Sequence, residues 1–272
     1  MIVSFGLGEG RLAIRVPDAD LAAAVAGLFP DYHREGAVED GPAVRLEARR
    51  TRDGYGLRGD PPLLGGEGEV TVGTRIELLT WIEAALARGL LRLRSGLTHL
   101  HAAGASLSGG GVLALGPADA GKSSLALAWS ARGRPLLGDD VVLLEAEGVA
   151  LPFRRLLRVD PERLLEHGVD PRTTPHWSDA YDRAWFDPRR AGGWCDAAVR
   201  PSLVVFLDRR RDAPVRIEEV EPAEALALTL SGVLSTGASP AASVDPIRRL
   251  LEGARAVRAR YGASARAAAL LA

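Results

Sequence analysis

The sequence predicts a mixed α/β fold, and three observations support this prediction. Residues 111–115 have the apolar composition of a short buried strand, and a glycine-rich turn and a helix-like stretch at 124–129 follow them. Residues 201–208 form a continuous apolar run, which is typical of a strand in a sheet covered on both faces. The first part of the chain alternates strand-like and helix-like patterns. We therefore expect a small mixed α+β domain at residues 1–96 and a larger α/β domain at residues 97–272.

The expected N-terminal domain contains two helices with recognisable starts. Asp18 is an N-cap residue before a helix that reaches about Leu28. Thr74 and Glu77 form a capping box before an amphipathic helix that Gly89 is expected to close. Strands are expected at 11–16, 43–49 and 55–58, with a hairpin turn at Asp53-Gly54 between the last two. These residues contain no catalytic constellation, so we expect a structural or partner-binding role for this domain.

Residues 97–107 are strand-like and contain two histidines. His99 and His101 are two positions apart, so a continuous strand would place them on one face. A zinc site normally needs three or four ligands, and no third ligand lies nearby in the sequence, so the pair does not predict a metal site. A single histidine beside an anion-binding site is the favoured interpretation. Gly109 and Gly110 predict a hairpin turn into the next strand.

The segment from Gly116 to Ser123 carries the strongest motif of the chain. It reads GPADAGKS, which matches G-x-x-x-x-G-K-[ST], and it lies between an expected strand and an expected helix. In such a loop the backbone N–H groups and the helix N-terminus bind a polyphosphate, the lysine neutralises the β- and γ-phosphates and the serine hydroxyl binds Mg²⁺. Lys122 is the only lysine of the chain, and a compact ammonium suits this position better than the rigid fork of an arginine.

The expected nucleotide-binding residues are those of the loop and the first helical turn: Gly116, Pro117, Ala118, Asp119, Ala120, Gly121, Lys122, Ser123 and Ser124. Asp119 is unusual there, because a carboxylate repels phosphate. Asp tolerates left-handed backbone angles, so the loop can keep its shape, with Asp119 either facing solvent or weakening nucleotide binding. The alternative interpretation of the segment is a glycine turn before an ordinary helix.

Two adjacent acids follow the expected helix, which ends at Gly133. Asp139 and Asp140 are flanked by apolar residues on both sides. One carboxylate can bind Mg²⁺ while the other accepts the proton of an acceptor hydroxyl. An acidic turn between two strands is the alternative interpretation. The position of the pair, one helix after the phosphate loop, favours the catalytic interpretation.

The order of these features resembles the catalytic domain of the HPr kinase/phosphorylase family. That family has a strand with a histidine, a hairpin, a phosphate loop, a short helix and an Asp-Asp pair at similar spacing, which corresponds here to residues 101–145. The resemblance implies a fold akin to phosphoenolpyruvate carboxykinase, with ATP and Mg²⁺ as cofactors and transfer of phosphate to a serine hydroxyl. Several relatives are encoded with peptide-modifying clusters, including lasso-peptide kinases, and the small N-terminal domain is similar to theirs.

The resemblance also implies roles for residues of this chain. Lys122 and Ser123 would bind nucleotide and metal. Asp139 is assigned to the metal and Asp140 to the base, although these two roles could be exchanged. His101 matches the active-site histidine of the family.

The chain departs from the family pattern at two places. Asp119 replaces the middle glycine of the loop. The family's arginine- and glycine-rich signature after the acids is missing, and residues 152–157 are the nearest candidate, in which Arg154 is expected to neutralise the charge of the transferring phosphate. Phosphorylation of HPr itself, and its reversal by phosphorolysis, are therefore not expected.

Composition restricts the partners of the protein. The formal net charge of the 272 residues is −1, so no overall field favours nucleic acid or an anionic membrane. The chain has one cysteine, Cys195, and neither an export signal nor an apolar run of about 18 residues, so we expect a cytoplasmic protein without a disulfide or a membrane span. The resemblance also raises the expectation of a homo-oligomer.

The region after the acids is less informative. Residues 160–200 have a loop-like composition and hold the aromatic residues Trp177, Tyr181, Trp185, Phe186 and Trp194. These aromatics would recognise an acceptor, form a satellite core or stack on nucleic-acid bases, and the satellite core is slightly favoured. Helices are expected at 222–233 and at 245–261, with a Gly/Ser loop at 234–242 between them and Gly262 as the cap of the second.

Taken together, these features predict an ATP- and Mg²⁺-dependent kinase that transfers the γ-phosphate to a hydroxyl. The expected acceptor is a serine of a peptide or protein, including the precursor of a peptide natural product. Two alternatives stay open. One is a regulatory nucleotide-binding protein without catalysis, and the other is a kinase of a small-molecule hydroxyl.

Overall fold

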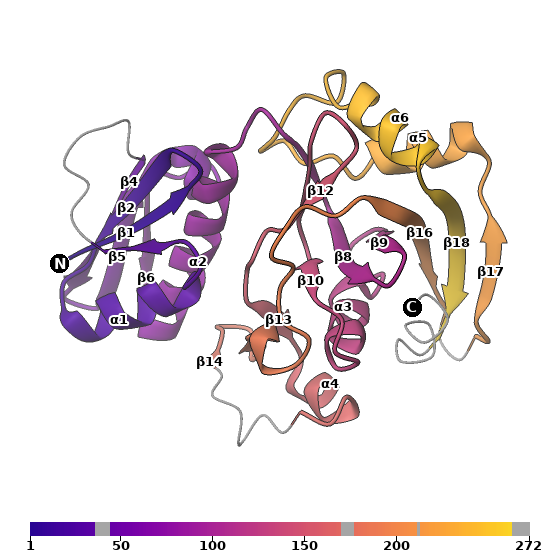
Figure 1. The fold of residues 1–272 in the computed structure, drawn as a ribbon. Coiled ribbons are helices and arrows are strands. Elements are labelled where there is room, and N and C mark those ends of the chain that lie inside the picture. The colour runs from indigo at the N-terminus through magenta and orange to yellow at the C-terminus, as the bar shows by residue number, and fades with distance from the viewer. Residues whose placement is uncertain (36–43, 170–176, 211–212, 263–272) are drawn as a thin grey trace. The chain divides into compact units, whose positions relative to one another are not determined.

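The computed structural model describes residues 1–35, 44–169, 177–210 and 213–262 (Figure 1). The chain divides into two compact units. The first comprises Met1–Ser95 with Trp177–Arg183, and the second comprises Gly96–His176 with Ala184–Ala272. Both units combine sheets with helices, which confirms the predicted mixed α/β class. The predicted domain boundaries at 1–96 and 97–272 stay a prediction, because compactness alone does not show that either part folds independently.

The first unit is built on a six-stranded sheet with the order β3-β1-β2-β4-β5-β6. β2 and β4 run parallel, and the other neighbours run antiparallel. The helices α1 and α2 pack on the sheet and against each other. Its elements are β1 (Ile2–Leu7), β2 (Gly10–Arg15), α1 (Ala19–Leu28), β3 (His33–Arg34), β4 (Val44–Thr51), β5 (Gly54–Gly59), η1 (Pro61–Leu63), β6 (Glu69–Val72) and α2 (Arg75–Arg92), and the returning segment adds β14 (Trp177–Ser178).

The predicted helix starts in this unit are confirmed. The carboxylate of Asp18 accepts a hydrogen bond from the backbone N–H of Leu21 over 2.8 Å, which caps α1. Thr74 and Glu77 form both hydrogen bonds of a capping box at the start of α2. The predicted hairpin between β4 and β5 is present, but Thr51 pairs with Gly54, so its two-residue turn is Arg52-Asp53, one residue earlier than predicted. Residue 43, the predicted start of β4, lies outside the described residues.

The predicted end of α2 at Gly89 is wrong. The helix continues through Gly89 to Arg92. Gly89 is buried inside the helix, and a Cβ atom there would lie 2.7 Å from Cδ2 of Leu12 on β2. The glycine therefore lets the helix approach the sheet closely and does not mark a helix end.

The second unit is built on a six-stranded mixed sheet with the order β10-β8-β9-β16-β18-β17. β16 runs parallel to both β9 and β18, while the other pairs are antiparallel. This arrangement confirms the prediction of a central strand at 201–208. Its elements are β7 (Thr98–Leu100), β8 (Ala102–Leu107), β9 (Gly110–Leu115), α3 (Lys122–Ser130), β10 (Leu136–Gly138), β11 (Val142–Leu144), β12 (Ala150–Leu151), β13 (Leu157–Val159), α4 (Pro161–Glu166), β15 (Ala184–Phe186), η2 (Pro188–Arg190), β16 (Pro201–Arg209), β17 (Arg216–Glu219), α5 (Pro222–Leu230), α6 (Val244–Glu252) and β18 (Arg255–Tyr261).

Both faces of this sheet are covered by helices (Figure 1). On one face Val112 and Ala114 of β9 pack in the cluster that contains the apolar residues of α3. On the other face Leu113 and Leu115 pack with residues of α5 and α6, such as Ile247. Successive residues of one strand thus enter opposite cores, which explains why β9 and the central strand β16 read as continuous apolar runs.

The predicted strand at 97–107 is broken at His101. β7 pairs with β11 in a small three-stranded sheet, whereas β8 pairs with β9 and β10 in the large sheet. Between them, the backbone N–H of His101 donates to the carbonyl oxygen of Gly232 over 2.8 Å. The chain therefore changes sheets at this residue, and the prediction that both histidines share one face of one strand is wrong.

The predicted helix at 245–261 is also wrong in its second half. α6 ends at Glu252, and the chain continues as strand β18 between β16 and β17. In this strand Val257, Ala259 and Tyr261 are buried at every second position, while the arginines between them are more exposed. The alternation is typical of a strand, and pairing on both sides outweighs the helix propensity of alanine and arginine.

Candidate active site

The segment 116–123, which we call the phosphate loop after its sequence motif, connects β9 to α3, as the motif predicted. The ammonium of Lys122 lies inside the loop and donates hydrogen bonds of 2.8 Å to the carbonyl oxygens of Gly116 and Pro117. Only 6% of this residue is exposed. α3 begins after Gly121, which has a φ of +96° and provides no side-chain cap. No side chain at the N-cap accepts a hydrogen bond from the first N–H groups of α3, so these groups are available to bind an anion.

The last described strand of the chain, β18, holds the loop in place. The hydroxyl of Tyr261 on β18 donates to the carbonyl oxygen of Ala120 over 2.9 Å, and both residues are buried. A Cβ atom on Gly121 would lie 2.6 Å from that hydroxyl oxygen, so only glycine fits beneath it. Asp119 has a φ of +60° and its side chain is exposed, so the residue keeps the left-handed shape of the loop while its carboxylate faces solvent.

A second cluster lies beside the loop and is centred on Asp140. Nε2 of His101 lies 3.0 Å from Oδ1 of Asp140, and Nη1 of Arg155 donates to Oδ2 over 3.0 Å. Burial acts to raise the pKa of Asp140, but the hydrogen bond from His101 and the charges of Arg155 and Lys122 outweigh it and lower the pKa below its ordinary value. Asp140 is thus a carboxylate at neutral pH with a partner on each oxygen.

Electrostatics link this cluster to the loop. Burial lowers the pKa of Lys122, and the negative charges of Asp140, Asp119 and Asp139 oppose that shift. All three carboxylates are therefore within electrostatic reach of the ammonium. Asp139 is itself buried, with 5% of the residue exposed. The loop lysine and the Asp-Asp pair, which were predicted from separate stretches of sequence, meet at one place.

Sequence reasoning missed Arg155. Arg154, which was predicted to neutralise the transferring charge, donates to the carbonyl oxygen of Cys195 over 2.7 Å and lies 3.4 Å from the carboxylate of Asp196. Its neighbour Arg155 is the one that pairs with Asp140. The two arginines are consecutive, and the sequence could not decide which side chain turns toward the acids.

The two histidines lie in different environments. His99 is fully buried, and its Nδ1 lies 2.9 Å from the hydroxyl of Thr236. The side chain of His101 is about one-third exposed, at 32%, beside Asp140. Within the described ranges no group of three or more His, Cys, Asp and Glu side chains is arranged to hold a metal ion.

A pocket of about 340 Å³ lies next to the start of the phosphate loop. We name it the His101 pocket. It is lined by His101, Leu115, Gly116, Pro117, Phe206, Leu207, Leu228, Ser231, Gly232 and Arg258. All of these residues belong to the second unit, and two of them are the residues whose carbonyl groups bind Lys122.

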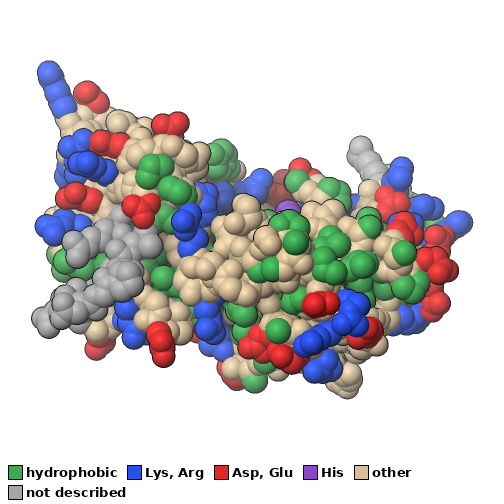
Figure 2. Space-filling model, turned by 90° about the horizontal axis from the view of Figure 1, so that it is seen from above, with side chains coloured by type: hydrophobic (Ala, Val, Ile, Leu, Met, Phe, Trp, Pro, Cys, Tyr) green, Lys and Arg blue, Asp and Glu red, His purple; other side chains and the backbone are tan. Residues whose placement is uncertain are grey.

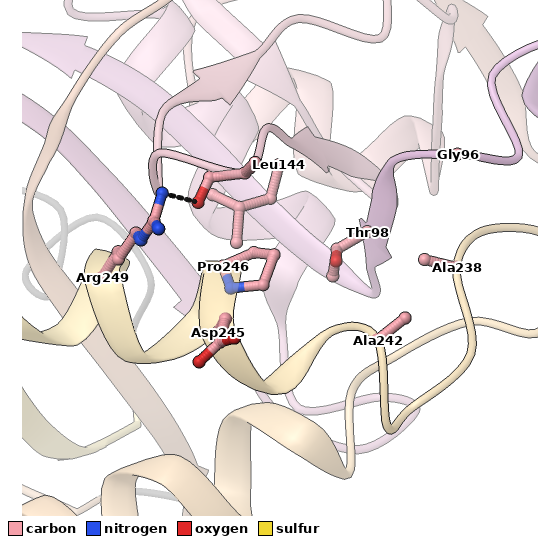
Figure 3. Close-up of a pocket in the computed structure, with 9 residues that line it drawn as sticks. Gly96, Thr98, Leu144, Ala238, Ala242, Asp245, Pro246 and Arg249 are labelled. Atoms are coloured by element: carbon pink, nitrogen blue, oxygen red, sulfur yellow. Dashed lines mark hydrogen bonds between the residues drawn. The ribbon is translucent and has the colours of Figure 1, made fainter.

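A second pocket in the same unit has about 310 Å³ (Figure 3). Its lining includes Thr98, whose hydroxyl donates to Ser243 over 3.0 Å, and Arg249, which donates to the carbonyl oxygen of Ala146 over 3.2 Å. Asp245 and Pro246 of α6 complete its polar and apolar edges. None of the predicted site residues lines this pocket.

The aromatic residues of the 160–200 region are mostly core. Trp185, Phe186 and Trp194 are buried, and Phe186 and Trp194 belong to the cluster around α3, which fits the satellite-core interpretation. Tyr181 is 71% exposed. The side chain of Trp177 lies outside the described part of the structure.

On the face of the molecule seen in Figure 2, acidic and basic side chains are interspersed, with hydrophobic side chains between them. Among the described residues, no helix has both the length and the apolar character to cross a membrane.

Comparison with known proteins gives a distant likeness only. No family model and no curated protein matches the chain. Among solved structures, the chain is similar to the HPr(Ser) kinase/phosphatase from Coxiella burnetii, with 16% sequence identity and a TM-score of 0.28 over 60% of this chain and 83% of that chain. At this level the likeness carries no argument about activity, so the function of the chain has to be inferred from its own residues.

Proposed function

We propose that the chain is an ATP- and Mg²⁺-dependent phosphotransferase that moves the γ-phosphate to a hydroxyl, with a serine of a peptide or protein as the acceptor. One observation carries the proposal. The buried ammonium of Lys122 lies inside a phosphate loop, and the carboxylate of Asp140, with His101 and Arg155 on its two oxygens, lies within its electrostatic reach. A phosphate-binding group and a group that can receive a hydroxyl are the two parts that phosphoryl transfer requires.

The loop fits the phosphate chain of a nucleotide. Lys122 now donates to two carbonyl groups of its own loop, and an ammonium has three donors, so phosphate oxygens can be added or substituted without moving the side chain far. The uncapped start of α3 supplies N–H groups and partial positive charge. Burial of Lys122 strengthens its interaction with phosphate, because fewer water molecules screen it.

Ser123 and Asp139 would hold Mg²⁺, and the ion would neutralise charge on the phosphate oxygens. The protein offers few ligands of its own, which suits Mg²⁺, since this ion commonly binds through one or two carboxylates together with substrate phosphates and water. Asp140 is less suited to the metal, because Arg155 and the hydrogen bond from His101 already balance its negative charge, while each oxygen keeps a further lone pair that can accept from a hydroxyl. We therefore keep Asp139 as the metal residue and Asp140 as the residue that receives the hydroxyl.

Asp140 acts mainly by orientation. Its lowered pKa makes it a weak base, but phosphoryl transfer passes through a loose transition state that needs little proton abstraction early on. Its carboxylate accepts a hydrogen bond from the acceptor hydroxyl and aims the oxygen at phosphorus. To Arg155, whose Nη1 lies 3.0 Å from Oδ2 of Asp140, we assign the stabilisation of the charge that develops on the transferring group. The same role for Arg154 stays a prediction.

The test is transfer of labelled phosphate from ATP with Mg²⁺ to serine peptides. Replacing Lys122 by Ala or Asp140 by Asn should lower kcat by about 10²-fold or more, because each removes a charged group from a preorganised site. Asp53→Asn, in the exposed β4–β5 turn, is the matched control and should keep full activity. Undiminished transfer by the Lys122→Ala protein would contradict the proposal.

A regulatory nucleotide-binding protein remains the second candidate, and Asp119 is the observation that favours it. Its carboxylate lies in the phosphate loop and is within electrostatic reach of Lys122, so it weakens the attraction for phosphate. ATP binding measured by calorimetry, without phosphate transfer to any hydroxyl, would support this candidate. A cytoplasmic location, homo-oligomer formation and the absence of nucleic-acid and membrane partners remain expectations from the sequence.

A further inference from the structure

The floor of the His101 pocket is built by strand register. Leu115, Phe206 and Arg258 occupy matching positions on the neighbouring strands β9, β16 and β18. Residues in register on neighbouring strands present their side chains on the same face, so these three lie in a row across the sheet. Leu228 of α5 and the turn at Ser231–Gly232 line the pocket from the helical layer.

The pocket lies at the end of the phosphate loop where the terminal phosphate belongs. Lys122 contacts the carbonyl oxygens of Gly116 and Pro117, and these two residues also line the pocket. A P-loop lysine reaches the β- and γ-phosphates, so the γ-phosphate is expected at this end of the loop. His101, which contacts Asp140, lines the same pocket. The pocket therefore opens on the acceptor side of the site.

The polar groups at the pocket edge already have partners. Arg258 donates to Glu224 over 2.6 Å, and the hydroxyl of Ser231 donates to the carbonyl oxygen of Leu228 over 2.7 Å. A charged ligand group would lose water there and would have to compete with these pairs. An apolar group would instead bury surface against Leu115, Phe206 and Leu228.

We infer that the His101 pocket binds a bulky apolar group that lies next to the phosphorylated hydroxyl of the acceptor. On a peptide, this group is an aliphatic or aromatic side chain adjacent to the serine. A volume of about 340 Å³ accommodates one such side chain and its surroundings. The inference rests on the proposed function, since it assigns the acceptor side from the position of the γ-phosphate.

In the reaction, the serine oxygen forms a bond to the γ-phosphorus while the bond from that phosphorus to the β,γ-bridging oxygen breaks. The electron pair of that bond leaves with ADP. The hydroxyl proton passes to Asp140 and from there to solvent. The apolar side chain in the pocket fixes the direction of the serine oxygen, so its benefit is expected in kcat as well as in KM.

The test compares blocked peptides that differ at one position. Each carries one serine in a glycine background, with leucine, aspartate or glycine directly before or directly after the serine. The better of the two leucine peptides should exceed the glycine peptide in kcat/KM by about tenfold or more, because burying a leucine side chain strengthens binding by at least that factor. The aspartate peptides should gain nothing. Equal kcat/KM for the leucine and glycine peptides would overturn the inference while leaving the kinase assignment intact.

Two variants, one just after the end of α5 and one in its first turn, locate the effect. Ser231→Phe places a ring in the pocket and should reduce the leucine advantage to about twofold or less. Ala223→Phe adds the same ring to an exposed position in the first turn of α5 and should preserve the advantage. Loss of the preference in both variants, or in neither, would contradict the assignment of the pocket.

A binding measurement separates this inference from the proposed function. The affinity of each peptide is measured by calorimetry on the protein loaded with Mg²⁺ and a non-hydrolysable ATP analogue. If no peptide is phosphorylated but the leucine peptide still binds about tenfold more tightly, and Ser231→Phe removes that difference, the pocket is supported and the catalytic proposal is not. Equal affinities of all peptides would overturn the inference whatever the transfer assay gives.

Discussion

The hydroxyl of Tyr261 holds the phosphate loop in place, although this residue comes 139 residues after Lys122 in the sequence. It donates to the carbonyl oxygen of Ala120, and burial raises the pKa of the phenol to about 12, so it stays a donor at every working pH. Without this donor, the buried carbonyl group would lose its partner, which costs about 1–3 kcal/mol.

We predict that Tyr261→Phe lowers the free energy of unfolding by about 1–3 kcal/mol and weakens the binding of ATP with Mg²⁺ several-fold. The loop would be less well held while the proposed catalytic groups around Asp140 stay in place, so KM should change more than kcat. Urea unfolding and calorimetry measure the two effects. Tyr55→Phe on β5 in the other unit is the matched control and should leave ATP affinity as it is. An unchanged ATP affinity in Tyr261→Phe would refute the positioning role.

Asp140 should make the stability of the protein depend on pH. Its pKa in the folded protein is lowered by His101, Arg155 and Lys122, so the carboxylate is stabilised relative to the unfolded chain. A group with a lowered pKa contributes stability above its unfolded pKa of about 3.9, and that contribution is lost as the pH falls toward the folded pKa. We predict that the difference in unfolding free energy between the wild type and Asp140→Asn is constant above about pH 5 and changes below about pH 4.

Urea unfolding at several pH values from neutral to acidic tests this dependence. The Asp53→Asn protein, altered at an exposed turn, serves as the reference and should follow the wild type throughout. A pH-independent difference between the wild type and Asp140→Asn would mean that the contacts with His101 and Arg155 do not hold the carboxylate charged.

At the scale of elements, α2 depends on a glycine in its interior. Gly89 normally would weaken a helix, but here its missing side chain makes room for Leu12, which is fully buried on β2. We predict that Gly89→Val lowers the free energy of unfolding by about 1–3 kcal/mol, because the buried leucine must leave its rotamer or the helix must move away from the sheet. Denaturant titration measures the loss. Ala84→Val, at a half-buried position of the same helix, controls for the helix propensity of valine and should cost less.

Element boundaries could be predicted where a local chemical signal marks them. Asp18, Thr74 and Glu77 fix helix starts through side-chain hydrogen bonds within three or four residues, and these starts were predicted correctly. Gly89 gives the same local signal as a helix cap, but its reason is a contact with a distant strand. Local sequence cannot distinguish the two cases, since the deciding atom belongs to Leu12.

The strand β18 shows the same limit on a larger element. Arginine and alanine favour a helix in isolation, and the sequence was interpreted that way. The residues form a strand because β16 and β17 pair with it on both sides. The same limit applies to the candidate site. The sequence pointed to Lys122 and the two acids, but the choice between Arg154 and Arg155 depends on how the chain folds back to Asp140.

At the scale of the whole molecule, the two units are not consecutive pieces of the chain. Trp177–Arg183 belongs with the first 95 residues. Within that unit the backbone N–H of Ala180 donates to the hydroxyl of Thr80 over 3.0 Å, and the buried carboxylate of Asp179 accepts from the N–H groups of Tyr181 and Arg183. A fragment that ends at residue 95 would lack this segment, so the full chain is the proper object for stability measurements.

The second unit contains all of the proposed machinery. The loop, the Asp140 cluster and the His101 pocket come from β7 to β18 and the segments between them, which are held together by one central sheet. The proposed function therefore needs residues of this unit alone, while the role of the first unit, which the sequence assigned to structure or partner binding, stays a prediction.

Lys122 also provides a single lysine at which the protein can be labelled chemically. No other side chain of the protein bears a primary amine, and burial lowers the pKa of this one, so more of it is neutral and nucleophilic than in an exposed lysine. A reagent that acylates only primary amines can therefore modify the chain only at this amine and at the α-amino group. Nucleotide in the loop would shield the first and leave the second open. The mass of the intact protein after acylation then distinguishes molecules modified at one amine from those modified at both, and so measures the fraction that holds a nucleotide.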